Sequence, residues 1–501
     1  MAVEAFSAVV TTGIYCRPGC AGRPRRDHVR EFGLAAAAEA AGFRACLRCR
    51  PYRSAHVVSW SGPELVCRAV QLIIDGALDD GTEAALGARL GVSGRHLRRL
   101  FTAHLGVTPD GLARSRRAHF ARRLLDDTDL TVTDIAFASG FGSIRQLNRA
   151  LREVFRASPR ELRARRHASD RLVADGGLAL RLPFSGPLEW DAMLAYLAPR
   201  AIPGIECVAG DTYRRSVVID AHPGVLELFP HDDGHLVLQA HLPHWEDLMH
   251  IVDRARRIPN LDIDMDEPNG CLAGDPTIGP LVHARPGLRP PGTWDPFENA
   301  VRAIIGQQVT IAGATTIAGR LVQQLGTPVP GLGQLGLTHT FPSAETIAGA
   351  DLSELGLTPA RAQSIRAFAQ AVLDDSVRLD RSVELDQLIA SITAIPGLGP
   401  WTAHYIALRL GEPDAFPATD LGLRQAFSQL RPRTTATLAQ LAEHWRPWRA
   451  FAATHLWKVA QVGRQAVNRV TAHKTPQSNQ PTSRMAPRAS TRQDLVASTP
   501  P

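Results

Sequence analysis

Apolar residues recur at helical spacing in two separate stretches of the first half of the chain. The first, "TEAALGARLGVSGRHLRRLFTAHLGVTP" (82–109), is interrupted at Gly91, and Ser93 stands where a helix N-cap is expected. About fifty residues later, "TVTDIAFASGFGSIRQLNRALREVFRASPRELR" repeats the arrangement, with a break at Gly140–Gly142 and a cap at Ser143. Each stretch therefore predicts a helix, a tight turn and a second helix.

The second half of the chain carries alternating patterns first and helical patterns afterwards. "LALRLPF", "RRSVVID" and "GHLVLQAHL" are typical of strands, and the stretch from Leu188 to Leu197 predicts a helix. From "WDPFENAVRAIIGQQVTIAGATTIAGRLVQQLG" onward the pattern is helical. These patterns predict a multidomain, predominantly α protein in which an α+β segment at 178–285 precedes an all-α region.

Length and composition narrow the class of protein. The 501 residues suggest three or four domains, and a 44% hydrophobic content allows sizeable cores. No apolar run is long enough to cross a bilayer and the start lacks secretory features, so we expect a cytoplasmic protein with reduced thiols. The net charge of +7 and the pI near 9.3 favour polyanionic partners. Because Lys458 and Lys474 are the only lysines, this charge is almost entirely arginine, which genome composition bias would also produce.

Four of the seven cysteines form two close pairs, Cys16/Cys20 and Cys46/Cys49. A C-x3-C pair followed by a C-x2-C pair is typical of zinc ligands, and a reducing compartment disfavours disulfides. A closed, purely structural zinc site is one interpretation. A reactive one is the alternative, because zinc-bound thiolates are nucleophiles. Neighbouring arginines would then hold a phosphate backbone beside the sulfur; they are Arg17, Arg23, Arg25, Arg26, Arg44, Arg48 and Arg50.

The cysteine-bearing segments "TTGIYCRPGC" and "GFRACLRCRP" closely resemble the N-terminal domain of the Ada proteins of the adaptive response. The resemblance implies methyl transfer from DNA methylphosphotriesters to a zinc-bound cysteine, with Cys16 as acceptor and Cys20, Cys46 and Cys49 as the other ligands. Methylation removes one negative charge, so DNA affinity should rise. Family members usually carry a helix and a strand before the motif, so either the true start lies upstream or this domain is trimmed.

The two helix-turn-helix units resemble the AraC/XylS DNA-binding domain, most specifically in the "SGFGS" run. Recognition helices read bases with their N-terminal residues. The predicted base contacts are Arg95, His96, Arg99, Arg145, Gln146 and Arg149, although these side chains could equally form a solvated face. The predicted core residues are Leu97, Leu100, Phe101, Leu147, Leu151 and Phe155.

A hairpin of glycines precedes a helix in "IPGLGPWTAHYIALRLGEPDAFPATDLGLRQAF". The hairpin Ile395–Gly399 lets backbone N–H groups approach a phosphate at a helix N-terminus. Its predicted DNA-contacting residues are Pro396, Gly397, Leu398 and Gly399. Trp401 and Tyr405 are four residues apart and share a helix face, and a lone Asp420 follows.

This ensemble resembles the helix-hairpin-helix DNA glycosylases. "HWRPWRAFAATHLW" and "LEWDAMLAYLAPRAIPGIE" point to the AlkA-type 3-methyladenine DNA glycosylases. The resemblance implies a flipped base in a pocket and Asp420 as the carboxylate that stabilises the sugar cation and orients or deprotonates water. The pocket residues so implied are Trp401, Tyr405, Trp457, Tyr196 and Gln308, the last at the position of a leucine wedge in the family. Core packing is the alternative for Trp457 and Tyr196.

Three features of related enzymes are missing from the sequence, and each absence limits the activity that we expect. Bifunctional relatives carry a Schiff-base lysine where this chain has Trp401, so we expect a monofunctional glycosylase. No cysteine follows Cys271, which excludes the iron–sulfur cluster of some relatives. No Pro-Cys-His-Arg segment occurs, so we expect no activity on O6-alkylguanine.

The predicted organisation is a fusion that senses alkylation, regulates transcription and excises alkylated bases. Its parts are an α+β four-cysteine Ada-like zinc domain (1–55), an AraC-type double helix-turn-helix domain (60–167), a linker (168–177), an α+β AlkA N-terminal-like domain (178–285), an all-α helix-hairpin-helix glycosylase domain (286–465) and a disordered tail (466–501). We expect one zinc ion, double-stranded DNA and RNA polymerase as partners, no membrane, and a monomer near the nucleoid. Two alternatives stay open: a regulator whose glycosylase half is an inactive DNA-binding platform, and a glycosylase whose zinc domain only anchors it to DNA.

Overall fold

A computed structural model describes residues 5–20, 22, 25–53, 62–167, 170–172, 177–220, 222–231 and 234–472. The expected linker at 168–177 lies largely outside these ranges, as does the predicted disordered tail beyond residue 472. The boundary expected at residue 465 falls within a helix, because α21 (Arg449–Ala472) continues past it. Within the described ranges, no helix has the length and hydropathy of a membrane span.

The N-terminal unit is a small sheet with one helix. The sheet has the order β3-β1-β2-β4, from β3 (Val29–Phe32), β1 (Phe6–Val9), β2 (Ile14–Cys16) and β4 (Arg44–Ala45). Helix α1 (Ala35–Ala40) joins β3 to β4. Because β2 and β4 pair in parallel, with Tyr15 opposite Ala45, they bring Cys16 and Cys46 to the same end of the sheet.

Seven helices follow the N-terminal unit. They are α2 (Glu64–Ile74), α3 (Glu83–Arg89), α4 (Gly94–Leu105), α5 (Pro109–Asp127), α6 (Val132–Ala138), α7 (Ile144–Phe155) and α8 (Pro159–Ala164). The two predicted caps are confirmed, because Ser93 accepts a hydrogen bond from the His96 N–H and Ser143 accepts one from the Gln146 N–H. The predicted core positions are buried, except that Leu100 is half-buried.

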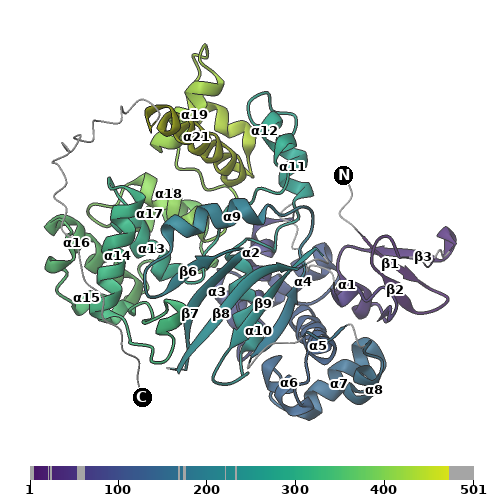
Figure 1. Ribbon diagram of the computed structural model, residues 1–501. Coiled ribbons are helices and arrows are strands. Elements are labelled where there is room, and N and C mark those ends of the chain that lie inside the picture. The colour runs from purple at the N-terminus through teal and green to yellow at the C-terminus, as the bar shows by residue number, and fades with distance from the viewer. Residues whose placement is uncertain are drawn as a thin grey trace, which may run out of the picture.

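A five-stranded antiparallel sheet of order β5-β9-β8-β7-β6 lies in the middle of the molecule (Figure 1). Its strands are β5 (Leu178–Leu182), β6 (Glu206–Ala209), β7 (Thr212–Ile219), β8 (His222–His231) and β9 (His235–His241), and it is accompanied by α9 (Trp190–Leu197) and α10 (Leu248–Arg257). Strands β5, β7 and β9 and helix α9 confirm the sequence predictions, whereas β6 and β8 were not predicted. One hydrophobic core joins this sheet to α5, α7 and the N-terminal unit, so these modules are packed together.

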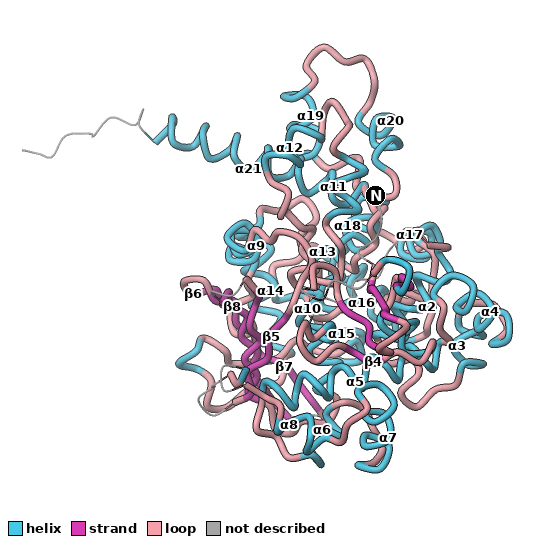
Figure 2. Tube along the Cα trace, turned by 90° about the vertical axis from the view of Figure 1, so that its right-hand side faces the viewer, coloured by secondary structure: helices cyan, strands magenta, loops and turns pink. Residues whose placement is uncertain are grey.

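The remaining residues are helical, as predicted. They form α11 (Asp266–Leu272), α12 (Gly279–Ala284), α13 (Pro296–Ile305), α14 (Ile311–Leu325), α15 (Ala344–Gly349), α16 (Pro359–Leu373), α17 (Leu385–Thr393), α18 (Pro400–Arg409), α19 (Leu421–Leu430), α20 (Leu438–Ala442) and α21. A second core runs through these helices and includes Ile202 and Ile205 from the sheet domain. Arg68 of α2 donates to the Val383 carbonyl, two residues before α17 begins, so α2 contacts this helical region (Figure 2).

Candidate active sites

The four paired cysteines converge at one end of the small sheet. Cys16 ends β2, Cys46 follows β4, and Cys20 and Cys49 lie on the turns after them. Their Sγ atoms all lie within 4.8 Å of one another, and all four residues are half-buried. The hydrogen bond between Cys16 and Cys49 raises the pKa of Cys16 and lowers that of Cys49 to about 5, so one thiolate is already favoured in this cluster. Four thiols at this spacing fit a single tetrahedral zinc ion.

Only part of the predicted arginine flank faces solvent at this site. Arg17, Arg25 and Arg48 are exposed. Arg50 is buried and its Nη1 donates to Asp170 at 2.6 Å, so its predicted phosphate contact is wrong. Its positive charge instead pairs with the Asp170 carboxylate. Arg44 is half-buried, while Arg23 and the side chain of Arg26 lie outside the described part.

A buried polar contact ties the cysteine-bearing strand to the helix-turn-helix domain. The Tyr15 hydroxyl, next to Cys16, donates to Glu39 at 2.6 Å, and the same carboxylate oxygen lies 2.6 Å from His119 Nε2. His119 belongs to α5, and its ring lies 5.7 Å from that of Phe155 at the end of α7. The cysteine cluster is therefore connected through three side chains to the second recognition helix.

Most of the predicted base-reading side chains face solvent. Arg95, Arg99, Arg145, Gln146 and Arg149 are exposed, while His96 is half-buried. Three of them have partners within their own helix or turn. Arg99 contacts His96 at 3.0 Å, Gln146 accepts from the Gly142 N–H at 3.0 Å, and Arg149 pairs with Glu153 at 2.9 Å. Such exposed contacts cost little to exchange for contacts with DNA.

Asp420 is held by three hydrogen-bond donors beside a cavity. It is the N-cap of α19, and its Oδ1 accepts from the Leu423 N–H at 3.0 Å and from Trp457 Nε1 at 2.9 Å. Its Oδ2 accepts from Trp401 Nε1 at 2.9 Å. The donors come from α18, α19 and α21, so three helices fix the orientation of this carboxylate.

Aromatic side chains line the same cavity, whose volume is about 450 Å³. The Trp401 and Tyr405 rings stack with centroids 5.4 Å apart, and Tyr405 meets Trp457 edge-on at 6.1 Å. Trp457 and Tyr196 are half-buried and both line the cavity, rather than being enclosed in a core. Because Trp401 and Tyr405 already stack on each other, a bound base would lie against an outer face of this pair.

Two arginines that were not predicted, Arg409 and Arg200, line the cavity next to Tyr196. Arg409 Nη1 donates to the Tyr196 hydroxyl at 2.8 Å, and the Tyr196 and Tyr405 hydroxyls are 2.8 Å apart. Arg200 covers the Tyr196 ring at 3.9 Å. Burial opposes ionisation of Tyr405, but Arg409 and Arg200 outweigh it and lower the pKa of Tyr405 to about 8. Arg409 continues the four-residue spacing of Trp401 and Tyr405, which would have been a signal for it.

Lys458, which was not predicted, lines the cavity, and Gln308, which was predicted there, does not. Lys458 follows Trp457 on α21, and its Nζ donates to Gln461 Oε1 at 3.3 Å. Burial lowers its pKa. Gln308 is exposed on the turn between α13 and α14 and is not among the residues lining the cavity, so its placement in the pocket is wrong. The exposed apolar neighbours Val309 and Ile311 line the cavity instead.

The predicted hairpin stands at the start of α18. Pro396, Gly397 and Gly399 are exposed, while Leu398 is buried in the core. Gly397 has φ +87°, and a Cβ there would lie 2.4 Å from the Ser364 Oγ, so the turn requires glycine. Gly399 caps α18 without a side chain. No side-chain cap therefore occupies the N–H groups of the first turn after Pro400, which leaves them available to a phosphate.

Four family models match successive parts of the chain. They are "Metal binding domain of Ada" at 2–52, "Helix-turn-helix domain" at 86–165, "AlkA N-terminal domain" at 179–295, and "HhH-GPD superfamily base excision DNA repair protein" at 301–449. The cysteine cluster, both recognition helices and the hairpin with Asp420 each fall inside a matched range. The resemblances identified from the sequence are thereby confirmed.

The "Probable bifunctional transcriptional activator/DNA repair enzyme AlkA" of Mycobacterium tuberculosis is 42% identical over 456 residues, which cover 90% of this chain and 92% of that protein. The chain belongs to this family of bifunctional activator/DNA repair enzymes. "DNA-3-methyladenine glycosylase 2" of Escherichia coli is 32% identical over 283 residues, 55% of this chain and 95% of that protein. "Bifunctional transcriptional activator/DNA repair enzyme Ada" of Escherichia coli is 32% identical over 178 residues, 35% of this chain and 48% of that protein. Within the family, the chain thus combines a four-cysteine zinc centre with a helix-hairpin-helix glycosylase fold.

Proposed function

We propose that this chain transfers a methyl group from DNA methylphosphotriesters to Cys16, regulates transcription through its two helix-turn-helix units, and excises alkylated bases of the 3-methyladenine class. The single observation that carries the glycosylase part is the Asp420 carboxylate, oriented by two indole N–H donors at the wall of an aromatic cavity. Contact with RNA polymerase and a monomeric state belong to the same proposal.

The excision step follows from the geometry around Asp420. The N-glycosidic bond breaks with its electron pair going to the base, which an alkylated purine accepts readily because it carries positive charge. Asp420 stabilises the positive charge that develops on the sugar and takes a proton from the attacking water, whose oxygen bonds to C1′. Trp401 and Tyr405 offer an electron-rich face to the departing base.

Methyl transfer uses the sulfur of Cys16. A sulfur–carbon bond forms while the oxygen–carbon bond of the phosphotriester breaks, and the phosphodiester recovers its negative charge. Cys16, Cys20, Cys46 and Cys49 would hold a zinc ion, which would favour their thiolate forms at neutral pH. The protein loses one negative charge from a surface that faces DNA, so affinity for DNA rises, and more so at low salt.

A base-release assay on duplex DNA containing 3-methyladenine tests the glycosylase proposal. We expect free base and an abasic strand that breaks only after alkaline treatment. Strand cleavage without alkali would contradict the monofunctional mechanism and direct attention to Lys458, which lines the cavity. Tight DNA binding with no base release would leave the glycosylase half as an inactive binding platform.

A further inference from the structure

A helix of the regulator contacts the end of the helix that carries the base pocket. Arg68 of α2 is 3% exposed, and its Nη1 donates to Glu412 Oε1 at 3.2 Å and to the Val383 carbonyl. Its Nε and Nη2 are held by Glu64 on the same helix, at 2.9 and 2.6 Å. Glu412 is itself 7% exposed and lies three residues after the last residue of α18. This ion pair therefore bridges the two halves of the chain in a buried environment, where it is weakly screened.

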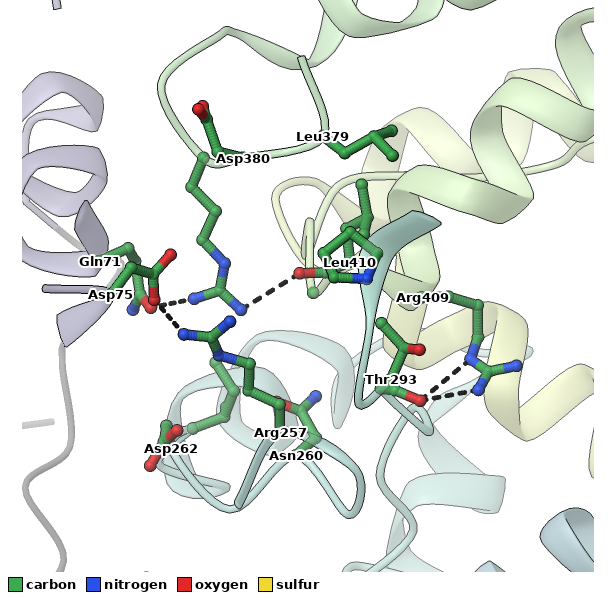
Figure 3. A pocket seen from close by; sticks show the side chains of 15 residues that line it. Gln71, Asp75, Arg257, Asn260, Asp262, Thr293, Leu379, Asp380, Arg409 and Leu410 are labelled. Carbon is green, nitrogen blue, oxygen red and sulfur yellow. Dashed lines mark hydrogen bonds and ion pairs between the residues drawn. The ribbon is translucent and has the colours of Figure 1, made fainter. Parts of the chain in front are cut away.

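A second contact joins the same two helices through Arg381 (Figure 3). Gln71, one turn along α2 from Arg68, accepts a hydrogen bond from Arg381 Nη1, and Arg381 Nη2 donates to the Leu410 carbonyl at 3.1 Å. A cation at this carbonyl also suits the negative end of the α18 dipole. Gly411 permits the approach, because it has φ +91° and a Cβ there would lie 2.7 Å from Arg381 Nη2.

Arg409, which directly precedes Leu410, lines the base pocket. Arg409 Nε and Nη2 donate to the Gly292 carbonyl at 3.3 and 2.7 Å, while its Nη1 donates to the Tyr196 hydroxyl. The first two bonds are the dashed lines that leave Arg409 in Figure 3. Arg409, Leu410 and Glu412 thus form one short segment. Arg409 lines the cavity. Glu412 is held directly by Arg68 of α2, and Leu410 is held by Arg381, which in turn bonds to Gln71 of α2.

We infer that α2 of the regulator is a positioning element for base excision: Arg68 and Gln71 fix the C-terminal end of α18 and thereby the placement of Arg409, Tyr405 and Trp401. This inference rests on the proposed glycosylase function. Neither Arg68 nor Gln71 lines the base pocket, so they act through α18 rather than on the base.

The chain offers a matched control at the same interface. Arg89 of α3 pairs with Asp380 at 2.5 Å, but these side chains are 41% and 32% exposed, and within the described residues neither forms a hydrogen bond or ion pair with α18. Arg89→Ala therefore removes a regulator–glycosylase ion pair without loosening α18. Arg68→Met keeps side-chain length and removes the charge.

The experiment measures single-turnover base release, DNA affinity and tyrosine ionisation for the full-length parent, Arg68→Met, Gln71→Ala and Arg89→Ala. Tyrosinate absorbance reports the pocket, because the pKa of Tyr405 is lowered to about 8 by Arg409 and Arg200 against burial, while burial raises the pKa of Tyr15, Tyr52, Tyr196 and Tyr213. These are all five tyrosines of the chain. A displaced Arg409 moves the first ionisation step to higher pH.

We expect Arg68→Met to slow base release by up to about 10²-fold, the order of loss that a slight misplacement of catalytic groups causes. DNA affinity should stay unchanged and the tyrosine step should move to higher pH. Gln71→Ala, which breaks no ion pair but removes one acceptor of the Arg381 guanidinium, should show a smaller loss in the same direction, and it provides the test if Arg68→Met does not fold. Arg89→Ala should match the parent.

Parental excision and an unmoved tyrosine step in folded Arg68→Met or Gln71→Ala would overturn the inference. An equal loss in Arg89→Ala would do so as well, because it would show a general effect of domain docking. If the parent releases no base, the proposed function fails, and the tyrosine step still decides whether α2 positions α18.

Discussion

Asp420 combines a structural role with its proposed chemical role in the same carboxylate. Its Oδ1 caps α19 and accepts from Trp457, while Oδ2 accepts from Trp401. A carboxylate with this many donors is fixed in direction before any substrate binds. Preorganised charge of this kind stabilises a cationic transition state without reorganisation.

Asp420→Asn should reduce base release by about 10²–10³-fold, because it removes the negative charge facing the sugar cation. The helix should survive, since asparagine caps helices as well as aspartate does. DNA binding should also survive, because the proposed contact between the hairpin and phosphate uses backbone N–H groups. Single-turnover base release paired with a DNA-binding assay measures both effects.

Asp295→Asn is the matched control, because Asp295 caps α13 by accepting from the Glu298 N–H at 2.8 Å and does not line the cavity. It should excise like the parent. Undiminished excision by Asp420→Asn would show that the carboxylate is wrongly assigned.

At the residue scale, local spacing predicted part of the site. Trp401 and Tyr405 were predicted to share a face because they lie one helical turn apart, and the structure stacks them. Arg200 lies four residues after Tyr196, and it was missed because the predicted helix ended at Leu197, whereas the chain stays helical through a short 3-10 turn (Ala198–Arg200). The prediction for Gln308 followed a family position, yet Gln308 is exposed on a turn with φ +56° and is not among the residues that line the cavity.

Helix α21 positions Trp457 and contains a buried histidine. His455 is 3% exposed, and burial, followed by the charge of Arg285, lowers its pKa to about 4. In the unfolded chain it would titrate near its ordinary value of about 6.5. The native state therefore binds no proton at His455 over a pH range in which the unfolded state does, so stability is lost as pH falls from about 6.5 towards 4.

Thermal unfolding measured between neutral pH and pH 4 tests this effect. Titration of His455 should lower the parent's free energy of unfolding by up to roughly 3 kcal/mol, since one pKa unit corresponds to about 1.4 kcal/mol. His455→Leu should show a shallower acid dependence, whereas His444→Gln, at an exposed histidine of the same domain, should behave like the parent. Parallel acid profiles of parent and His455→Leu would contradict the assignment.

The zinc centre belongs to the small sheet as a unit, because one predicted ligand ends β2, one directly follows β4, and two lie on the turns after them. We expect one zinc ion per chain by elemental analysis. Cys46→Ser should lose most of the metal and lower the unfolding temperature, because metal binding and folding are coupled in such domains. Cys271→Ser is the control, since Cys271 is exposed and outside the cluster. A full zinc content in Cys46→Ser would contradict four-cysteine ligation.

Elements with local signals were predictable, and those that depend on distant pairing were not. Ser93 and Ser143 cap helices through bonds to residues three positions away. Strand β8 lies between β7 and β9, although Pro223, which cannot donate a ladder hydrogen bond, stands near its start. Only the neighbouring strands stabilise its extended conformation.

The modules of the whole molecule are packed together rather than strung on linkers. Arg50 pairs with Asp170, and Arg68 with Glu412, across 120 and 344 residues of sequence. An arginine-rich sequence offers many possible partners for each carboxylate, so composition could predict DNA binding but not this docking. The Tyr15–Glu39–His119 contact and the α2–α18 contact place the regulator between the cysteine cluster and the base pocket.

Mass spectrometry of one reaction tests the central claim most directly. The full chain is incubated with duplex DNA that carries both methylphosphotriesters and 3-methyladenine, and the protein peptides and the small-molecule fraction are both analysed. The account predicts one methyl group on the peptide containing Cys16, never exceeding one per chain, while free 3-methyladenine accumulates beyond the amount of protein. A methyl group on another residue, an unmethylated Cys16, or the absence of free base would contradict it.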